Sequence, residues 1–137
     1  MANSTTLYQL ADGRMAVDVT ENKTLAIKDC GVVQNVITDG LTMTLPATVV
    51  GYRYIFRNGG VKATNGPTRS GSDGTVALVV APNAADLIAG MEVTAADNKS
   101  FTNTKATSKV GDSLELIGDG TNGWNVTAVS GIWAKAA

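Results

Sequence analysis

The chain has 137 residues, enough for one domain with a sizeable core, and only 17% of them are charged. Its net charge of −1 gives no reason to expect nucleic acid or an anionic membrane as a partner. Histidine is absent and Cys30 is the only cysteine. This composition excludes a disulfide within the chain, histidine-based nucleophiles and the usual zinc sites.

Neither a secretory leader nor a membrane-spanning helix is evident in the sequence. Residues 1–10 lack both a basic leader and an apolar core of secretory length. The longest apolar run, residues 76–82, is far shorter than the roughly 20 residues that a transmembrane helix needs. We therefore expect a soluble protein that is made in a cytoplasm.

Short β-prone runs separated by turn residues predict strands over most of the chain. The first three runs are residues 15–19, 24–28 and 32–37. In the next run Leu41, Met43 and Leu45 alternate with threonines, so we expect them to face the core. Pro46 ends this strand because it has no N–H to donate to a sheet.

Two later runs also have strand character. Residues 52–57 alternate between one face with Tyr52, Tyr54 and Phe56 and another with Arg53, Ile55 and Arg57. The three aromatic residues are expected in the core. Residues 75–81 are uninterrupted apolar sequence, which predicts a strand covered on both faces at the centre of a sheet.

Two segments depart from the strand pattern. Residues 82–90 place helix formers between a proline and a glycine and predict one or two turns of helix. Residues 58–74 are rich in Gly, Asn, Thr and Ser and predict a long exposed excursion.

Near the C-terminus, residues 118–123 match the G-x-G-x-x-G pattern of dinucleotide-binding loops. A phosphate-binding loop leads from a strand into a helix, whereas period-two strand sequence lies on both sides of these glycines. The segment is therefore interpreted as a β-hairpin with an Asp-Gly/Asn-Gly turn, and its expected core positions are Leu114, Leu116, Trp124 and Val126.

The elements together predict an all-β fold, a sandwich or a barrel-like sheet, with at most one short helix near residues 84–89. Residues 1–24 are expected to form an N-terminal arm or the first strands. Residues 25–137 are expected to form a single β-rich domain.

Enzymatic chemistry would have to rely on the carboxylates Asp112, Glu115 and Asp119, which are close in sequence. Asp112 and Asp119 flank a strand at turn positions, where aspartate is favoured for its hydrogen bonds to nearby backbone. Nothing marks the apolar pocket that an acid/base pair needs, and the calcium-loop spacing is absent. We expect no catalytic residues, no cofactor and no metal.

Charge is unevenly distributed along the chain. Residues 46–75 hold four bases and one acid, for a local charge of +3, while each flanking region carries −2. The four bases are Arg53, Arg57, Lys62 and Arg69. They are candidates for contacts with an acidic partner, although ordinary solvated charge beside a loop explains them as well.

The order of motifs along the chain resembles that of small virion proteins of tailed bacteriophages, including head decoration (cement) proteins and related β-modules of head and tail fibres. The motifs are GVVQNVIT, LTMTLPA, GYRYIFRN, VVAPNAADLIAG, NTKAT, VGDSLELIGDG, GWNV and SGIW. The resemblance covers about residues 30–134, and the first 25 or so residues have no counterpart in it.

This resemblance implies a non-enzymatic decoration protein that binds the major capsid protein on the outer surface of the phage head as a homotrimer and stabilises it. The implied location is the exterior of the virion, with no nucleic acid or membrane partner.

An N-terminal arm, residues 3–10, is a candidate for adding to a neighbour's sheet edge, with Leu7, Tyr8 and Leu10 as apolar anchors. A disordered terminus is an equal alternative.

The competing hypothesis is a head- or tail-fibre module that binds a host receptor or glycan. Its surface would combine the loop at residues 58–74 with Tyr52, Tyr54 and Trp124. The shared parity of Tyr52 and Tyr54 with Phe56 favours a core position for both tyrosines instead.

Overall fold

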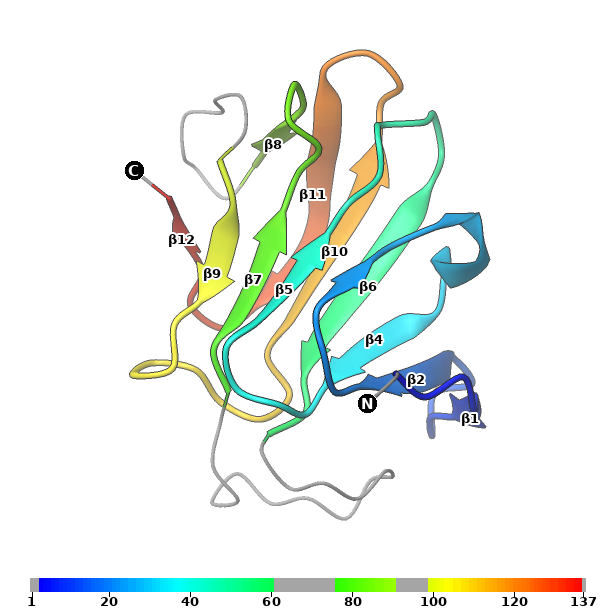
Figure 1. The fold of residues 1–137 in the computed structure, drawn as a ribbon, viewed down its shortest axis with the longest axis vertical. Helices are drawn as coiled ribbons and strands as arrows, with labels where there is room; N and C mark the ends of the chain where they lie inside the picture. The colour runs from blue at the N-terminus through cyan, green and yellow to red at the C-terminus, as the bar shows by residue number, and fades with distance from the viewer. Residues whose placement is uncertain (1–2, 61–75, 91–98, 137) are drawn as a thin grey trace.

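The computed structural model describes residues 3–60, 76–90 and 99–136, which form two stacked β-sheets (Figure 1). The all-β prediction is confirmed. In the described part of the chain the only helical element is one turn of 3-10 helix, η1 (Ile27–Asp29). The strands are β1 (Tyr8–Gln9), β2 (Met15–Val19), β3 (Lys23–Thr24), β4 (Val33–Val36), β5 (Leu41–Thr44), β6 (Arg53–Asn58), β7 (Leu78–Ala81), β8 (Leu87–Ala89), β9 (Phe101–Asn103), β10 (Ser113–Gly118), β11 (Gly123–Ser130) and β12 (Ala134–Lys135).

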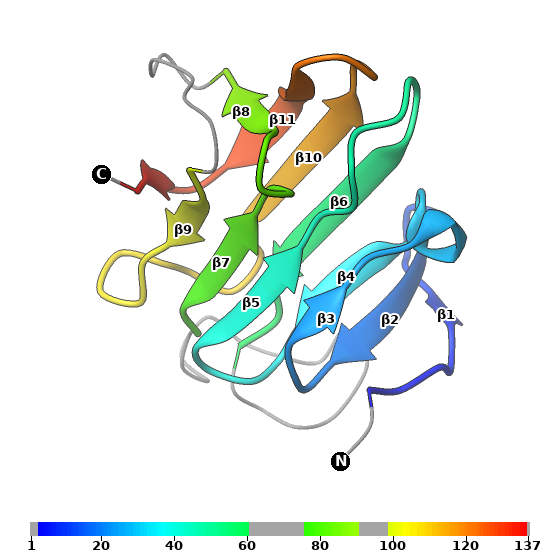
Figure 2. The same cartoon turned by 45° about the horizontal axis from the view of Figure 1, so that its top comes forward.

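The chain alternates between the two sheets for most of its length. One sheet has the order β1-β2-β4-β6-β10-β11-β8 and the other has the order β12-β9-β7-β5-β3. Figure 2 shows β3, β5 and β7 as one layer and β2, β4 and β6 as the other. The strands β2, β4 and β6 are parallel neighbours, and so are β3, β5 and β7. Parallel neighbours need a crossover connection, and here a strand of the opposite sheet forms part of each crossover.

The main core lies between the sheets. Leu41, Met43 and Leu45 are buried, as expected. Tyr54, Phe56 and Trp124 are fully buried. The expectation was also right for Leu114 and Leu116, while Tyr52 and Val126 are only partly buried against the core. Strand β7 is the middle strand of its five-stranded sheet, as predicted. Its Leu78 and Val80 are buried, but Val79 is partly exposed, so only one face of β7 is fully covered.

A second, smaller apolar cluster lies on the opposite side of the seven-stranded sheet. Ala16, Val33 and Ile55 pair across β2, β4 and β6, and Tyr8 and Leu10 pack over them. Ile55 belongs to the face opposite the aromatic residues of β6, as the alternation predicts. It is nonetheless only 2% exposed, because the N-terminal segment covers this part of the sheet.

Three local predictions were wrong. Residues 24–28 do not form one strand, because the Asp29 carboxylate accepts a hydrogen bond from the Ala26 N–H at 2.9 Å and closes the η1 turn. Residues 82–90 form a turn and strand β8 instead of a helix, because the segment pairs in parallel with β11. Asn58, Gly59 and Gly60, the start of the expected exposed excursion, are buried. Residues 61–74 of that excursion lie outside the described part.

The predicted C-terminal hairpin is confirmed. Strands β10 and β11 are antiparallel, with an irregularity in register between Glu115 and Leu116. One carboxylate oxygen of Asp119 accepts hydrogen bonds from the N–H groups of Thr121, Asn122 and Gly123 at 2.8, 2.8 and 3.0 Å. The backbone of the G-x-G-x-x-G segment is therefore used to build a turn between two strands.

Buried amides join the two sheets at one end of the core. Asn58 of β6 donates to the side-chain oxygen of Asn103 of β9 at 2.7 Å. Asn103 in turn donates to Asp112 at 3.1 Å, and Asp112 also accepts from the Lys109 N–H at 2.9 Å. Asp112 therefore has the local backbone bond expected of a turn aspartate, and its carboxylate is held within a structural network.

Candidate functional site

The outer face of the seven-stranded sheet, the side turned away from the five-stranded sheet, carries a continuous line of hydrogen-bonded side chains. Tyr8 Oη donates to Asp18 Oδ1 at 2.6 Å, and Asn35 Nδ2 donates to the same oxygen at 2.9 Å. Arg57 Nη1 then donates to Asn35 Oδ1 at 2.8 Å. The line crosses β1, β2, β4 and β6, so four neighbouring strands hold these groups in fixed positions.

Burial and the Asp18 carboxylate raise the pKa of Tyr8 well above the usual tyrosine value. Burial disfavours the phenolate, and the hydrogen bond to a carboxylate stabilises the protonated phenol. Tyr8 is therefore a hydrogen-bond donor at every physiological pH. Its ring covers the small apolar cluster while its hydroxyl satisfies a buried charge.

A second group of charged side chains lies on the same face, further toward β10 and β11. Arg53 donates from Nε and Nη2 to Glu115 Oε1 at 3.0 and 2.8 Å. Thr127 Oγ1 donates to the other carboxylate oxygen of Glu115 at 2.8 Å. The hydrogen bond from Arg53 is the main cause that lowers the pKa of Glu115. Glu115 is therefore ionised near neutral pH, and Arg53 is oriented along the sheet.

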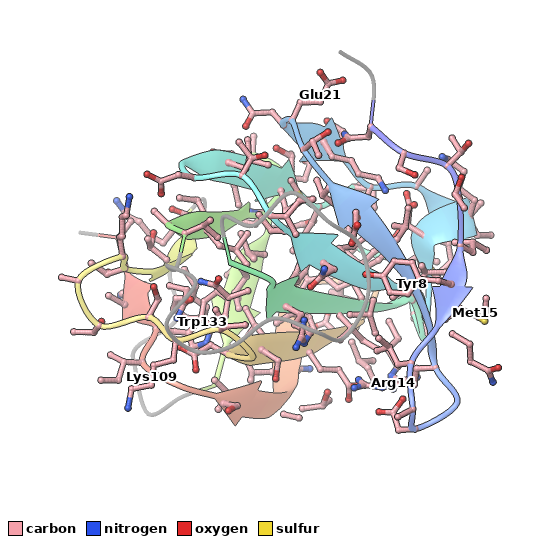
Figure 3. All side chains as sticks on the ribbon, turned by 90° about the horizontal axis from the view of Figure 1, so that it is seen from below. Tyr8, Arg14, Met15, Glu21, Lys109 and Trp133 are labelled. Carbon is pink, nitrogen blue, oxygen red and sulfur yellow. The ribbon has the colours of Figure 1, made fainter. Side chains whose placement is uncertain are left out.

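The N-terminal segment is fastened to the sheet at both of its ends. Asn3 Oδ1 accepts from the N–H groups of Thr20 and Glu21 at 2.8 and 3.0 Å. Five residues later β1 pairs antiparallel with β2, through Tyr8↔Ala16 and Gln9↔Met15. Within this single chain, residues 3–10 thus bind the edge of their own sheet. Figure 3 places Tyr8, Arg14 and Met15 on one side of the molecule and Lys109 and Trp133 on the other.

The structure brings four of the seven predicted contact residues to this outer face. Tyr8, Leu10, Arg53 and Arg57 belong to it, through the contacts given above. Leu7, directly before β1, lines a pocket with Val17 and Val32 instead and is 51% exposed. Lys62 and Arg69 lie outside the described residues.

Asp18 and Asn35 are the residues of this face that the sequence-based reasoning missed. Asp18 is the single polar residue of β2, Asn35 follows Gln34 in β4, and each is at most 7% exposed. A buried polar side chain needs a partner, so two such residues in neighbouring strands indicate a shared network. For Asp18 that signal is present in the sequence. The sequence does not indicate that β2 pairs with β4, and it is this pairing that brings Asp18 opposite Asn35.

The three carboxylates that were considered for catalysis have separate sets of partners. Asp112 contacts Asn103, Glu115 contacts Arg53, and Asp119 caps the hairpin turn. Hydrogen bonds from the turn backbone, chiefly the Gly123 N–H, lower the pKa of Asp119. In the described part of the chain, no three His, Cys, Asp or Glu side chains are grouped so that they could hold a metal ion.

Comparison with known proteins gave no relative: no family model, no curated protein and no solved structure matches the chain. Within residues 3–60, 76–90 and 99–136, no helix has the length and apolar character needed to cross a membrane.

Proposed function

We propose that this chain is a non-enzymatic capsid decoration protein that binds the outside of a phage head as a homotrimer and stabilises the head. Its resemblance to phage virion proteins over residues 30–134 supports the proposal, and so does the all-β sandwich. The observation that carries it is the outer face of the seven-stranded sheet. There, Tyr8, Leu10, Arg53 and Arg57 meet on one rigid surface.

A preformed surface of this kind suits a docking role. The side chains of Tyr8, Arg53 and Arg57 are already held by hydrogen bonds to neighbouring strands. Docking then requires little further loss of side-chain freedom, which is one of the main costs of association. A trimer presents three such faces at once, so modest contacts in each copy combine into firm binding.

The N-terminal segment has a specific place in this mechanism. β1 is the outermost strand of its sheet, and only its β2 side is paired in the described part of the chain. A strand of the major capsid protein adding to the other edge of β1 gains main-chain hydrogen bonds. Deleting residues 1–12 is a poor test of this role, because the deletion also uncovers Ala16, Val33 and Ile55. Point substitutions on the outer face are more informative.

A matched pair of substitutions tests the proposed docking face. Arg53 pairs with Glu115 at 2.8 Å, and Lys105 pairs with Asp39 at 2.8 Å beside the other sheet. Both cations are exposed, so each substitution by alanine removes an exposed ion pair, a kind of interaction that contributes little to stability. Binding to undecorated heads of the source phage is measured by cosedimentation.

We expect Arg53→Ala to weaken head binding about tenfold, because a loss of about 0.5 kcal/mol in each copy sums to about 1.5 kcal/mol in a trimer. Lys105→Ala should bind like the unchanged protein. Equal binding by the two variants would remove the outer face from the mechanism. Failure of the unchanged protein to bind heads would contradict the function itself.

The fibre-module alternative receives no specific support from the fold. Two of the three aromatic residues proposed for a glycan surface, Tyr54 and Trp124, are fully buried between the sheets. Tyr52 is half-buried, and its ring lies edge-on to the Tyr54 ring with centroids 6.5 Å apart. A receptor surface would therefore need residues other than this aromatic set.

A further inference from the structure

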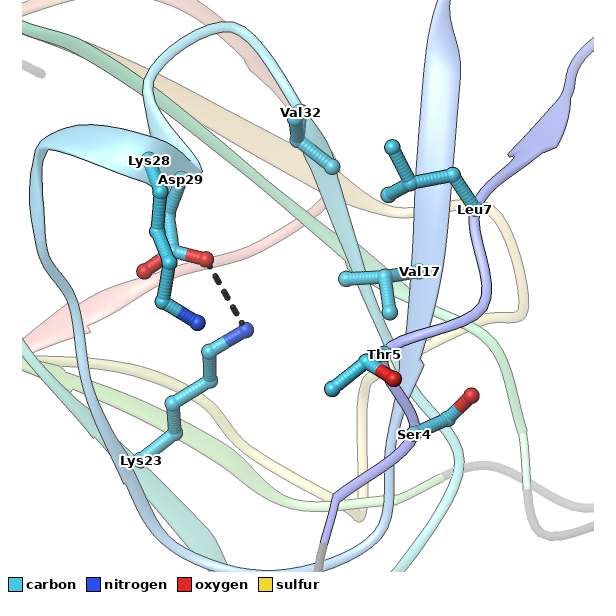
Figure 4. A pocket seen from close by; sticks show the side chains of 8 residues that line it. All are labelled: Ser4, Thr5, Leu7, Val17, Lys23, Lys28, Asp29 and Val32. Carbon is cyan, nitrogen blue, oxygen red and sulfur yellow. Dashed lines mark ion pairs between the residues drawn. The ribbon is translucent and has the colours of Figure 1, made fainter.

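A pocket of about 340 Å³ lies between the N-terminal segment, β2, β3 and η1. Figure 4 shows that its walls differ in character. Leu7, Val17 and Val32 form an apolar wall, while the side chains of Lys23, Lys28 and Asp29 gather on the opposite side. The hydroxyl groups of Ser4 and Thr5 lie at one end of the apolar wall. The volume is within the range of small-molecule sites.

The polar wall has one positive charge in excess. The side chains of Lys23 and Asp29 are only 13% and 7% exposed and are paired at 3.1 Å. Asp29 also accepts from the Ala26 N–H at 2.9 Å, so both of its oxygens are engaged. The Lys28 side chain forms no hydrogen bond or ion pair within the described residues. Its ammonium group therefore gives the pocket a net charge of +1.

Lys23 adds a directed donor to this charge. Its ammonium group has three N–H bonds, and two of them are accounted for by Asp29 and by Gln34 Oε1, which lies at 2.7 Å. One N–H bond remains for a ligand. Lys23 is held from two sides and largely buried, so this donor has a defined direction and stands in a site of reduced solvent screening.

We propose that this pocket binds a single carboxylate carried on a short aliphatic stem. One net positive charge balances a monoanion, whereas a dianionic phosphate would leave one charge uncompensated in a partly buried site. The carboxylate accepts from Lys23 and Lys28, and the stem packs on Leu7, Val17 and Val32. The ligand is either a free short-chain carboxylate or the carboxyl end of a peptide chain, since both offer the same group. The site does not depend on the proposed capsid role.

Binding is tested by following the backbone amide NMR signals of the full chain during titration with sodium hexanoate and, separately, with the neutral hexanamide. Hexanoate should shift signals of residues around the pocket and bind at least tenfold more tightly than hexanamide. Lys28→Gln should weaken hexanoate binding about fivefold or more, and Lys28→Arg should restore it. Lys109→Gln is the matched control, because Lys109 is also exposed and lies on the far side of the molecule from the N-terminal segment. It should leave binding within about twofold.

A second arm identifies the source of the carboxylate. The peptide acetyl-Ala-Ala-Leu with a free carboxyl group is compared with the same peptide as its amide. If the acid binds at least tenfold more tightly than both its amide and hexanoate, the ligand is the end of a protein chain. If hexanoate binds at least as tightly as the acid, the ligand is a free small carboxylate. The proposal is overturned if neither carboxylate shifts the pocket signals, if hexanamide binds as tightly as hexanoate, or if Lys109→Gln weakens binding as much as Lys28→Gln.

Discussion

Asp18 and Asn35 show how buried polar residues in neighbouring strands organise the surface around them. Leaving a buried carboxylate without donors is costly, and the sheet supplies Asp18 with two of them, Tyr8 and Asn35. The sequence indicates that Asp18 is unusual, because it is the one polar residue of β2, whereas Asn35 follows another polar residue, Gln34. It does not indicate their partners, because those depend on which strands become neighbours. The burial of Ile55 could not be predicted from its own strand either, because it depends on Tyr8 and Leu10, which pack over it.

The Arg53–Glu115 pair leads to a prediction about pH at the residue scale. The pKa of Glu115 in the folded protein lies below its ordinary value of 4.5, chiefly because Arg53 donates to its carboxylate. A depressed carboxyl pKa contributes stability that is fully present above the ordinary value and is lost as the pH falls through the folded value. Since Arg53 is 44% exposed, we expect a contribution of about 0.5 kcal/mol.

Glu115→Gln should therefore lower the free energy of unfolding by about 0.5 kcal/mol at pH 7 and by nearly nothing near pH 3. Urea unfolding of both proteins at the two pH values measures this difference. If the two proteins differ in free energy of unfolding as much at pH 3 as at pH 7, the ion pair is not the source of the difference.

At the scale of elements, residues 82–90 show tertiary structure overriding local propensity. The segment contains good helix formers, yet the Leu87 N–H donates to the Asn122 carbonyl at 3.0 Å and β8 joins the sheet beside β11. The Asp86 carboxylate also accepts from the Thr48 N–H at 2.9 Å, which fixes the turn before β8. The local sequence does not indicate that this segment pairs with Asn122 and Thr48. By contrast, the hairpin of β10 and β11 was predictable, because its strands and turn are contiguous.

The close approach of β8 to β11 explains one glycine of the G-x-G-x-x-G segment. A Cβ atom on Gly123 would collide with the backbone of Leu87, and Gly123 also has a positive φ of 153°. Gly51 has a positive φ of 82° but open space around the position of a Cβ atom. We expect Gly123→Ala to destabilise the fold by about 3 kcal/mol or more, through strain together with a displaced strand. Gly51→Ala should cost only about 1–2 kcal/mol, the strain alone.

Thermal or urea unfolding of the two alanine variants distinguishes these effects. Equal losses of stability would mean that β8 does not pack against Gly123 as described. A nucleotide-binding role for the glycines predicts a different outcome, namely a nucleotide affinity that Gly123→Ala abolishes without a large change in stability.

At the scale of the whole molecule, the sequence was sufficient for the fold class and insufficient for the topology. Period-two alternation in residues 41–45 and 52–57 predicted the strands and their core faces, because that pattern is local. The winding from one sheet to the other is not local, since every parallel neighbour of β4 and β5 lies one full crossover away. Two separate features of the sequence, its local charge and its N-terminal segment, indicated the candidate contact residues. Four of them, Tyr8, Leu10, Arg53 and Arg57, meet on one face because of the strand order β1-β2-β4-β6.

The shared position of these residues on the outer face predicts how the protein is oriented on the capsid in the proposed function. A protein that docks through the outer face of its seven-stranded sheet turns the five-stranded sheet away from the capsid. The Arg53 side chain then lies at the interface and Lys105 lies away from it.

Cryo-electron microscopy of undecorated heads of the source phage, incubated with the purified protein, tests the decoration proposal most directly. We predict three copies at three-fold or quasi-three-fold positions on the outer surface, with the seven-stranded sheet facing the major capsid protein. Density on the tail alone, no density on the head, or bound molecules that turn the five-stranded sheet to the capsid would contradict the account.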